Sequence, residues 1–209
     1  MMRPAVSVVM ATYNRGNVIA YAIDTLRSGA CQDWELIVVG DGCTDETSAV
    51  VDAIGDARIR FFNLERNHGE QSGPNNHGVT HARGRYLAYL NHDDLWLPCH
   101  LQRAMETLET TGADLVFGQG VLVADSGSHH VLTGACCDSL QPYQPWMVAP
   151  ASLWVMRREL ADRVGPWRPS AELRAPPSQE WLHRAHRKGA RSEEHTSELQ
   201  SQFRISYAV

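Results

Sequence analysis

The sequence lacks any apolar run close to the roughly 20 residues that a membrane-spanning helix requires. Its first residues lead directly into a β-branched run at Val6, so we expect no signal peptide. Cysteine is also scarce: there are five, none has CxxC spacing, and Cys136 and Cys137 are adjacent. We therefore expect a cytoplasmic protein with reduced thiols, and peripheral association with the inner face of a membrane stays open.

Charge of one sign is not concentrated in this chain. The formal net charge is −5 at pH 7, and no basic patch predicts binding to nucleic acid. A glycine-rich phosphate loop is missing too, because Asp45 stands where the pattern GxGxxG needs a third glycine after Gly40 and Gly42. A nucleotide phosphate would therefore need a metal ion or local arginines.

The C-terminal residues read unlike the rest of the chain. Arg191–Ser201 is RSEEHTSELQS, the in-frame translation of a common sequencing adapter. A polar, solvated C-terminal helix is the alternative. We expect residues 191–209 to be a non-native tail and the natural protein to continue past Ala190. Residues 1–190 have the length of one domain with a sizeable core.

The first half of the chain alternates β-branched runs with amphipathic segments. The predicted strands are Val6–Thr12, Glu35–Gly40, Ile59–Asn63 and Arg85–Leu90. The predicted helices are Val18–Ser28, a segment from Thr44 or Asp45 to Ile54, Pro74–Ala82 and Pro98–Thr110. This order predicts an α/β fold, with a Rossmann-like, mostly parallel sheet flanked by helices in a single domain.

The pattern changes after Gly112. We expect a hairpin from Leu115–Ala124 and Val131–Thr133, a strand at Ala151–Met156, and helices at Arg157–Val164 and Ser178–Lys188, with Ser178 as the cap of the last one. We expect residues 1–111 to form a nucleotide-donor half and residues 112–190 an incomplete acceptor half.

Carboxylates follow the second and fourth predicted strands. Asp41, after Gly40, suits recognition of a base or ribose, although a plain turn former is the alternative. Asp93 and Asp94 end the segment Asn91-His92-Asp93-Asp94, and adjacent carboxylates repel each other until a cation neutralises them. This pattern favours Mg²⁺ or Mn²⁺, and a polar turn with one helix-capping acid is the alternative.

Glu180 opens the last predicted helix beside Trp181 and Leu182. A carboxylate in such apolar surroundings suits a general base. The alternative is a first-turn glutamate that interacts favourably with the helix dipole.

Together these segments resemble glycosyltransferase family 2, which has the GT-A fold. The resemblance covers Val6 to about Gly189. Its motifs are Thr12-Tyr13-Asn14-Arg15, Asp41-Gly42-Cys43-Thr44-Asp45, and the series Asn67, Gly69, Asn75-Asn76, Gly78, Ala82 and Gly84. The D-x-D motif of the family maps onto Asn91-His92-Asp93, and its E-D pair onto Gln179-Glu180.

The resemblance implies transfer of a sugar from a nucleotide-sugar donor, most often a UDP-sugar, to a hydroxyl of a glycan, lipid-linked or small-molecule acceptor. It implies a single displacement with inversion, a Mn²⁺ or Mg²⁺ ion on Asp93, and Glu180 as the base. The residues implied to contact the donor are Thr12, Tyr13, Asn14, Arg15, Asp41, Asn91 and His92.

Two other functions remain open. A nucleotide-sugar-binding module, or an inactive truncated remnant, would bind the donor without turnover, and Asn91 and Gln179 in place of acids favour it. A nucleotidyltransferase is less well supported, since the segment after the first strand offers only Arg15 and Gly16 where a glycine-rich basic loop is expected.

Overall fold

The β-branched runs form a sheet, as predicted, in a computed structural model that describes residues 3–123, 129–132, 145, 149–195 and 201–205. Four parallel strands lie in the order β3–β2–β1–β4. Their bounds are Val6–Thr12 for β1, Trp34–Gly40 for β2, Ile59–Asn63 for β3 and Tyr86–Tyr89 for β4. The predicted mostly parallel α/β sheet is thus confirmed.

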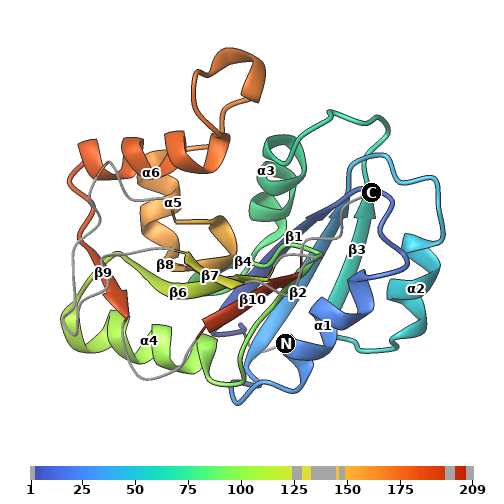
Figure 1. Ribbon diagram of the computed structural model, residues 1–209, viewed down its shortest axis with the longest axis horizontal. Coiled ribbons are helices and arrows are strands. Elements are labelled where there is room, and N and C mark those ends of the chain that lie inside the picture. The colour runs from blue at the N-terminus through green and yellow to red at the C-terminus, as the bar shows by residue number, and fades with distance from the viewer. Residues whose placement is uncertain (1–2, 124–128, 133–144, 146–148, 196–200, 206–209) are drawn as a thin grey trace.

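Helices cover both faces of the sheet and make three layers (Figure 1). One face carries α1 (Ile19–Arg27), α2 (Thr47–Ala53) and α4 (His100–Thr111), and the other carries α3 (Ser72–His81), α5 (Arg158–Val164) and α6 (Pro177–Arg187). Side chains of a strand alternate between faces, so Val8 and Met10 pack with the first set and Val9 with the second.

The register brings the carboxyl ends of three strands to one edge. Thr12 of β1 pairs with Gly40 of β2, and Val9 pairs with Tyr89 at the end of β4. The segments that follow these strands therefore meet, as is usual for ligand sites in open α/β sheets.

The second half extends the sheet with antiparallel strands. Strand β8 (Trp154–Arg157) pairs with β4 and with β6 (Leu115–Val123), and β7 (His129–Leu132) pairs with β6 in the predicted hairpin. Ala124 and Thr133 lie outside the described residues. The strand predicted from Ala151 begins at Trp154 instead, because Ala151–Leu153 form a 3-10 turn (η1). A second such turn, η2, is Ser170–Glu172.

Helix α6 begins one residue earlier than predicted. Pro176 is its N-cap and Pro177 its first residue, a position that suits proline because no hydrogen bond to its nitrogen is needed. The expectation that Ser178 caps the helix is therefore wrong, and Ser178 lies inside the first turn. Trp181 of α6 packs on Trp154 with ring centroids 5.6 Å apart, which fixes the rotation of the helix.

The segment beyond Ala190 contributes strands at the far side of the sheet. Strand β9 (Ser192–His195) and strand β10 (Ser201–Ile205) both run parallel to β6, and β10 also pairs with β5 (Asp94–Leu95). The origin of this segment and the division into two halves stay predictions. Among the described residues, no helix has the length and apolar character to cross a membrane.

Candidate functional site

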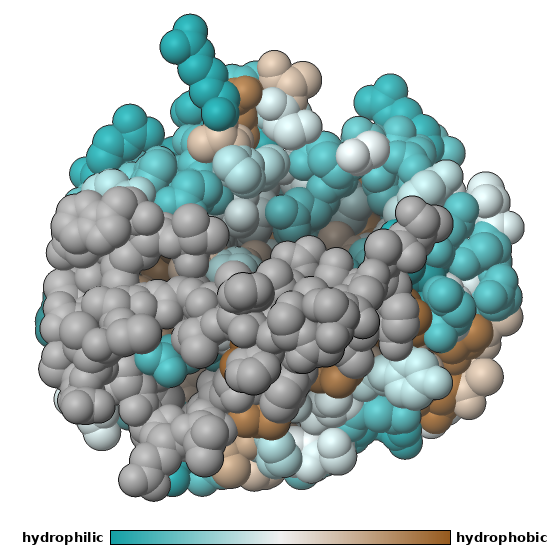
Figure 2. Space-filling model, in the orientation of Figure 1, coloured by the Kyte–Doolittle hydropathy of each residue, from teal (hydrophilic) through white to brown (hydrophobic). Residues whose placement is uncertain are grey.

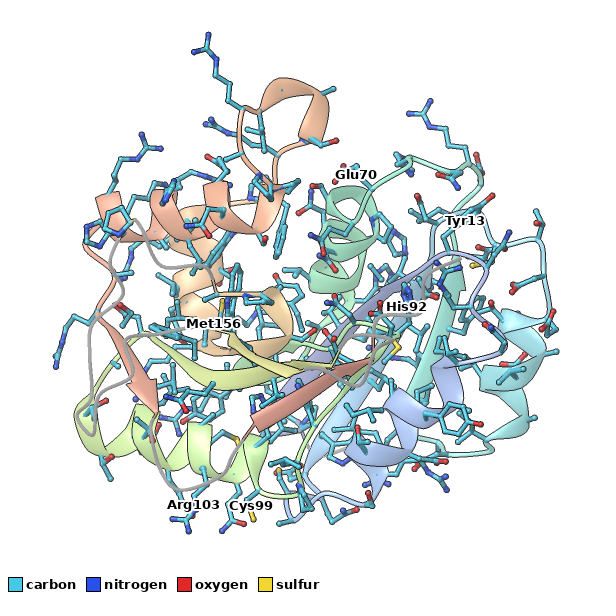
Figure 3. The ribbon with its side chains drawn as sticks, in the orientation of Figure 1. Tyr13, Glu70, His92, Cys99, Arg103 and Met156 are labelled. Atoms are coloured by element: carbon cyan, nitrogen blue, oxygen red, sulfur yellow. The ribbon has the colours of Figure 1, made fainter. Side chains whose placement is uncertain are left out.

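A cavity of about 410 Å³ lies where β1 and β2 end, between their following loops and α3. It is lined by Ala11, Thr12, Tyr13, Asp41, Asn67, Gly69, Glu70, Gln71, Pro74 and His92. Figure 3 labels Tyr13, Glu70 and His92, which come from three separate segments and lie around this region. The described surface over α3 and its neighbouring loops is mostly hydrophilic (Figure 2).

A second cavity of about 260 Å³ adjoins the first, because Ala11, Gln71 and His92 line both. Its other lining residues are Asn91, Asp93, Pro150, Ala151 and Ser178. We call the larger space the Asp41 cavity and the smaller one the Asp93 cavity. The two adjoin as one site, with the carboxylates of Asp41 and Glu70 in the larger part and that of Asp93 in the smaller part.

Thr12 and Tyr13 line the Asp41 cavity at the end of β1. The Thr12 side chain is buried, and its Oγ1 has no hydrogen-bond partner in the described part of the chain. A buried hydroxyl left unpaired is unfavourable, so a ligand that bonds to it gains free energy. Tyr13 is 44% exposed and presents an aromatic ring on which a planar group can stack.

Asp41 lies deep in the larger cavity, with 4% of its surface exposed. Its carboxylate accepts hydrogen bonds from the backbone N–H groups of His68 (2.9 and 3.0 Å) and Gly69 (3.0 Å), and the His68 ring Nδ1 lies 2.8 Å away. The approach of this loop depends on Gly42, where a Cβ would lie 2.8 Å from the backbone nitrogen of Asn67.

Asn14 and Asp45 join the loops that follow β1 and β2. Asn14, with a φ of 49°, accepts hydrogen bonds at Oδ1 from the backbone N–H groups of Thr44 (2.9 Å) and Asp45 (3.3 Å). The Asp45 carboxylate accepts from Gly16 N–H at 3.1 Å and from Thr47 N–H at 3.0 Å. Burial raises the pKa of Asp45, but a hydrogen bond from the Thr47 hydroxyl and the two backbone bonds outweigh burial and leave the pKa below its ordinary value.

Two of the predicted donor-binding residues do not line either cavity. Asn14 is committed to the loop contacts above, and Arg15 donates its backbone N–H to Thr47 Oγ1 at 2.9 Å and its Nη1 to Asn14 O at 3.2 Å. The residues that the structure brings together at the two cavities are Thr12, Tyr13, Asp41, Asn91, His92 and Asp93, and Asn14 and Arg15 are not among the lining residues.

The two adjacent acids after β4 have different surroundings. Asp94 is buried and accepts hydrogen bonds from Asn91 Nδ2 at 2.8 Å and from Ser152 Oγ. Ser152 Oγ also accepts from Asn91 N–H at 2.9 Å, which ties η1 to the end of β4. Asp93 instead lines the cavity. Ser152 was missed by the sequence reasoning, because nothing in the pattern links residues so far apart.

At Asp93 the protein supplies only some of the ligands that a divalent cation needs. No cluster of three or more His, Cys, Asp or Glu side chains suited to a metal ion occurs in the described part of the chain. Mg²⁺ and Mn²⁺ commonly take one or two carboxylates and complete their shells with substrate phosphates and water. Asp93, whose carboxylate has no partner among the described residues, lines a cavity and fits that mode.

Glu180 is not brought to these cavities. Its carboxylate pairs with Arg184 at 3.0 Å and with Arg168 at 3.7 Å, and its side chain is 12% exposed. It lines a third cavity, of about 290 Å³, together with Arg174 and Arg187 among others. The residue of α6 that lines the Asp93 cavity is Ser178, which the sequence reasoning treated only as a cap.

A mostly parallel sheet with ligand-sized cavities at the carboxyl ends of its strands defines the class of open α/β ligand-binding proteins. Residues 7–165 match the profile of glycosyl transferase family 2, and the chain belongs to that family. The predicted family is thus confirmed.

Sequence relatives are glycosyltransferases and polysaccharide-biosynthesis proteins. The succinoglycan biosynthesis protein ExoO of Rhizobium meliloti (strain 1021) is 38% identical over 112 residues, which are 54% of this chain and 32% of that protein. The UDP-Glc:alpha-D-GlcNAc-diphosphoundecaprenol beta-1,3-glucosyltransferase WfgD of Escherichia coli is 28% identical over 54% of this chain and 44% of that protein. The chain thus spans less than half of either relative.

Solved structures share the fold. S. aureus TarS 1–349 in complex with UDP-GlcNAc has a TM-score of 0.82 at 18% identity, over 98% of this chain and 59% of that chain. The mannosyltransferase PcManGT from Pyrobaculum calidifontis in complex with GDP-Man and Mn²⁺ has a TM-score of 0.72 at 17% identity, over 97% of this chain and 57% of that chain.

Proposed function

We propose that this chain transfers a sugar from a nucleotide-sugar donor to an acceptor hydroxyl. The observation that carries the proposal is the pair of adjoining cavities. One contains Asp41 and the Thr12 hydroxyl, which has no partner among the described residues, and the other contains Asp93. A nucleotide sugar has the same order of parts: a base and ribose, then a diphosphate, then the sugar.

In this proposal the nucleoside occupies the Asp41 cavity. The base stacks on Tyr13 and gives an N–H to Asp41, while Thr12 Oγ1 bonds to the nucleoside. Asn14 and Arg15 act on the donor indirectly, by holding the loop that carries Tyr13. The relatives bound to UDP-GlcNAc and to GDP-Man support a nucleotide-sugar donor, and UDP is the carrier that we propose.

The diphosphate and sugar occupy the Asp93 cavity. Asp93 would hold a Mn²⁺ or Mg²⁺ ion there, with Asn91 and His92 beside it. Such an ion supplies positive charge next to the departing diphosphate. The chain's own residues orient the donor and enclose the diphosphate between β4, η1 and the start of α6.

The transfer step is proposed as a single displacement with inversion. The acceptor oxygen forms a bond to the anomeric carbon as the bond to the nucleoside diphosphate breaks, and the hydroxyl proton passes to a base. Glu180 is the proposed base. In the arrangement described above it pairs with Arg184 and lines a different cavity, so it can take that proton only after it leaves the ion pair and reaches the acceptor hydroxyl beside the Asp93 cavity.

Calorimetric titration with UDP, GDP and dTDP, with and without Mn²⁺, tests the donor site. We expect one nucleotide to bind in a Mn²⁺-dependent manner, and Asp93→Ala to remove the Mn²⁺ dependence. Asp24→Ala, an exposed acid on α1, is the matched control. Folded protein that binds no nucleotide under any condition would contradict the proposal.

A second candidate function is donor binding without turnover. The Arg184 pairing of Glu180 and the amide of Asn91 in the position of an acid favour it. Binding of a UDP-sugar that never releases UDP, in the presence of varied glycan, lipid-linked and small-molecule acceptors, would distinguish this function from the enzyme.

A further inference from the structure

The carboxylate of Asp41 already accepts most of the hydrogen bonds that it can accept. Three N–H groups in the described part of the chain make four contacts with it, between 2.8 and 3.0 Å. A carboxylate has about four acceptor positions on its two oxygens. Three donors leave about one of these positions, and Asp41 is only 4% exposed, so a nucleobase N–H competes with these donors for the carboxylate.

The three donors differ in how easily they leave. Two are backbone N–H groups of His68 and Gly69, whose positions are fixed by a turn in which Gly69 has a φ of +74°. The third is the imidazole of His68, on a side chain that rotates and is 33% exposed. Because a carboxylate only accepts, Nδ1 carries the proton in this contact. The imidazole is thus the exchangeable donor.

The His68 ring also has a defined place to rest. It lies over Gly73 in the first turn of α3, where a Cβ would be 3.2 Å from the ring. This packing holds the ring beside Asp41, so moving the ring away from the carboxylate requires free energy. Asn67 and Gly69, on either side of His68, both line the Asp41 cavity, so the exchange takes place at the wall of the cavity.

We propose that His68 is a positioning residue that acts through Asp41: its imidazole occupies the carboxylate in the free protein and is displaced by a base that presents an N–H. This inference rests on the proposed nucleotide site and adds a specificity device to it. A ligand that cannot replace the lost N–H leaves the imidazole in place and gains nothing from Asp41. The protein then binds a matching base less tightly than it would without His68, but it distinguishes that base from ligands that lack the N–H.

The test compares two substitutions of His68 by calorimetry with UDP. His68→Phe keeps a ring over Gly73 but has no N–H, so we expect UDP affinity to rise about 10- to 100-fold, the worth of one charge-assisted hydrogen bond no longer broken. His68→Gln keeps a side-chain N–H, so affinity should stay within about twofold of the wild type. In the Asp41→Asn background the gain from His68→Phe should fall below about twofold.

The outcomes separate the inference from the proposed function. If the wild type binds UDP and His68→Phe binds it equally or more weakly, the imidazole only supports the loop and the inference fails while the donor site stands. A gain that persists in Asp41→Asn would also overturn it, because the effect would not pass through Asp41. If His68→Phe does not fold, as judged by thermal unfolding, His68→Ala provides the same comparison. Wild-type protein that binds no nucleotide contradicts the proposed function itself.

Discussion

The two ends of strand β2 each carry a buried acid, and the two are held in different ways. At the start of the strand, the Glu35 side chain is 3% exposed and accepts hydrogen bonds from Ser7 Oγ (2.7 Å), Arg60 (3.0 Å) and Arg83 (2.7 to 2.9 Å). At the other end, Asp41 is held by two backbone N–H groups and one imidazole.

This difference indicates that Glu35 stabilises the fold and that Asp41 belongs to a binding site. Around Glu35 the charge is matched by guanidinium groups, and the backbone closes tightly, since a Cβ at Gly84 would lie 2.4 Å from Ser7 N. Around Asp41 one donor is exchangeable, and the nearby Thr12 hydroxyl has no partner in the described chain. One end of the sheet therefore stabilises the fold, and the other retains bonding capacity for a ligand.

The largest effect on stability is expected from Glu35→Gln. The buried carboxylate loses its charge-assisted hydrogen bonds, while Arg60 and Arg83 are partly exposed and regain water, so we expect the free energy of unfolding to fall by about 2 to 3 kcal/mol. Urea denaturation measures this change, with the exposed Asp24→Asn on α1 as control. UDP affinity of the folded fraction should not change. A loss of affinity with no loss of stability would reverse the roles given to the two ends.

Acidification should reduce the difference in stability between the wild type and Glu35→Gln. Burial raises the pKa of Glu35, but the bonds from Arg83 and Ser7 outweigh burial and hold it below its ordinary value. The contribution of a carboxylate with a lowered pKa is fully present above its unfolded pKa and is lost as pH falls through the folded value. The stability gap between wild type and Glu35→Gln should therefore shrink below about pH 4. A gap that is constant from pH 7 to pH 3 would contradict this.

Glu180→Gln extends the comparison to α6, where an acid is again paired with arginine. If Glu180 is the base, turnover should fall at least about 100-fold while nucleotide affinity is unchanged, since proton transfer contributes about that factor or more. Release of nucleoside diphosphate from the donor identified by calorimetry is the measurement. Ser178→Ala, which alters the α6 residue at the Asp93 cavity, is the matched variant. Turnover retained in Glu180→Gln would mean that Glu180 only anchors α6, as Glu35 anchors β2.

The sequence predicted the strand ends because their periodicity is local. Acids that follow parallel strands lie at the same edge of the sheet, so the positions of Asp41 and Asp93 were predictable, while their roles stay predictions. The direction of a side chain on α6 depends instead on where the helix starts and on the packing of Trp181 against Trp154. Those contacts link distant segments, and no pattern around Glu180 encodes them.

Residues in irregular loops were equally hidden. His68 lies in a segment without periodicity, and its contact with Asp41 follows from the φ values and close approach of two loops. Which of Asp93 and Asp94 faces the cavity is decided by Ser152, which bonds to Asp94 from a separate turn. A pair of adjacent acids predicts a polar turn, but not which acid is exposed.

Asp41→Asn should weaken UDP binding by about 10- to 100-fold, because a hydrogen bond to a charged acceptor is lost and the new amide faces the backbone N–H groups of His68 and Gly69. The same mismatch should lower the free energy of unfolding by about 1 to 2 kcal/mol. Calorimetry and urea denaturation of the same preparation measure both. Asp41→Asn should lose UDP affinity and Glu35→Gln should lose none. This contrast distinguishes the two ends of β2 most clearly.

Among the substitutions that lower UDP affinity, Thr12→Val should have the smallest effect, and its effects on affinity and on stability should differ in sign. Valine has nearly the shape of threonine, and the hydroxyl that it removes is buried without a partner in the described chain, so stability should stay the same or rise by up to about 1 kcal/mol. UDP affinity should nevertheless fall about threefold to tenfold, the worth of one neutral hydrogen bond. Thr12→Ser keeps the hydroxyl and should bind as the wild type does. A variant that loses stability but not affinity would mean that Thr12 Oγ1 bonds within the protein, and the ligand-binding end of the sheet would then be as closed as the Glu35 end.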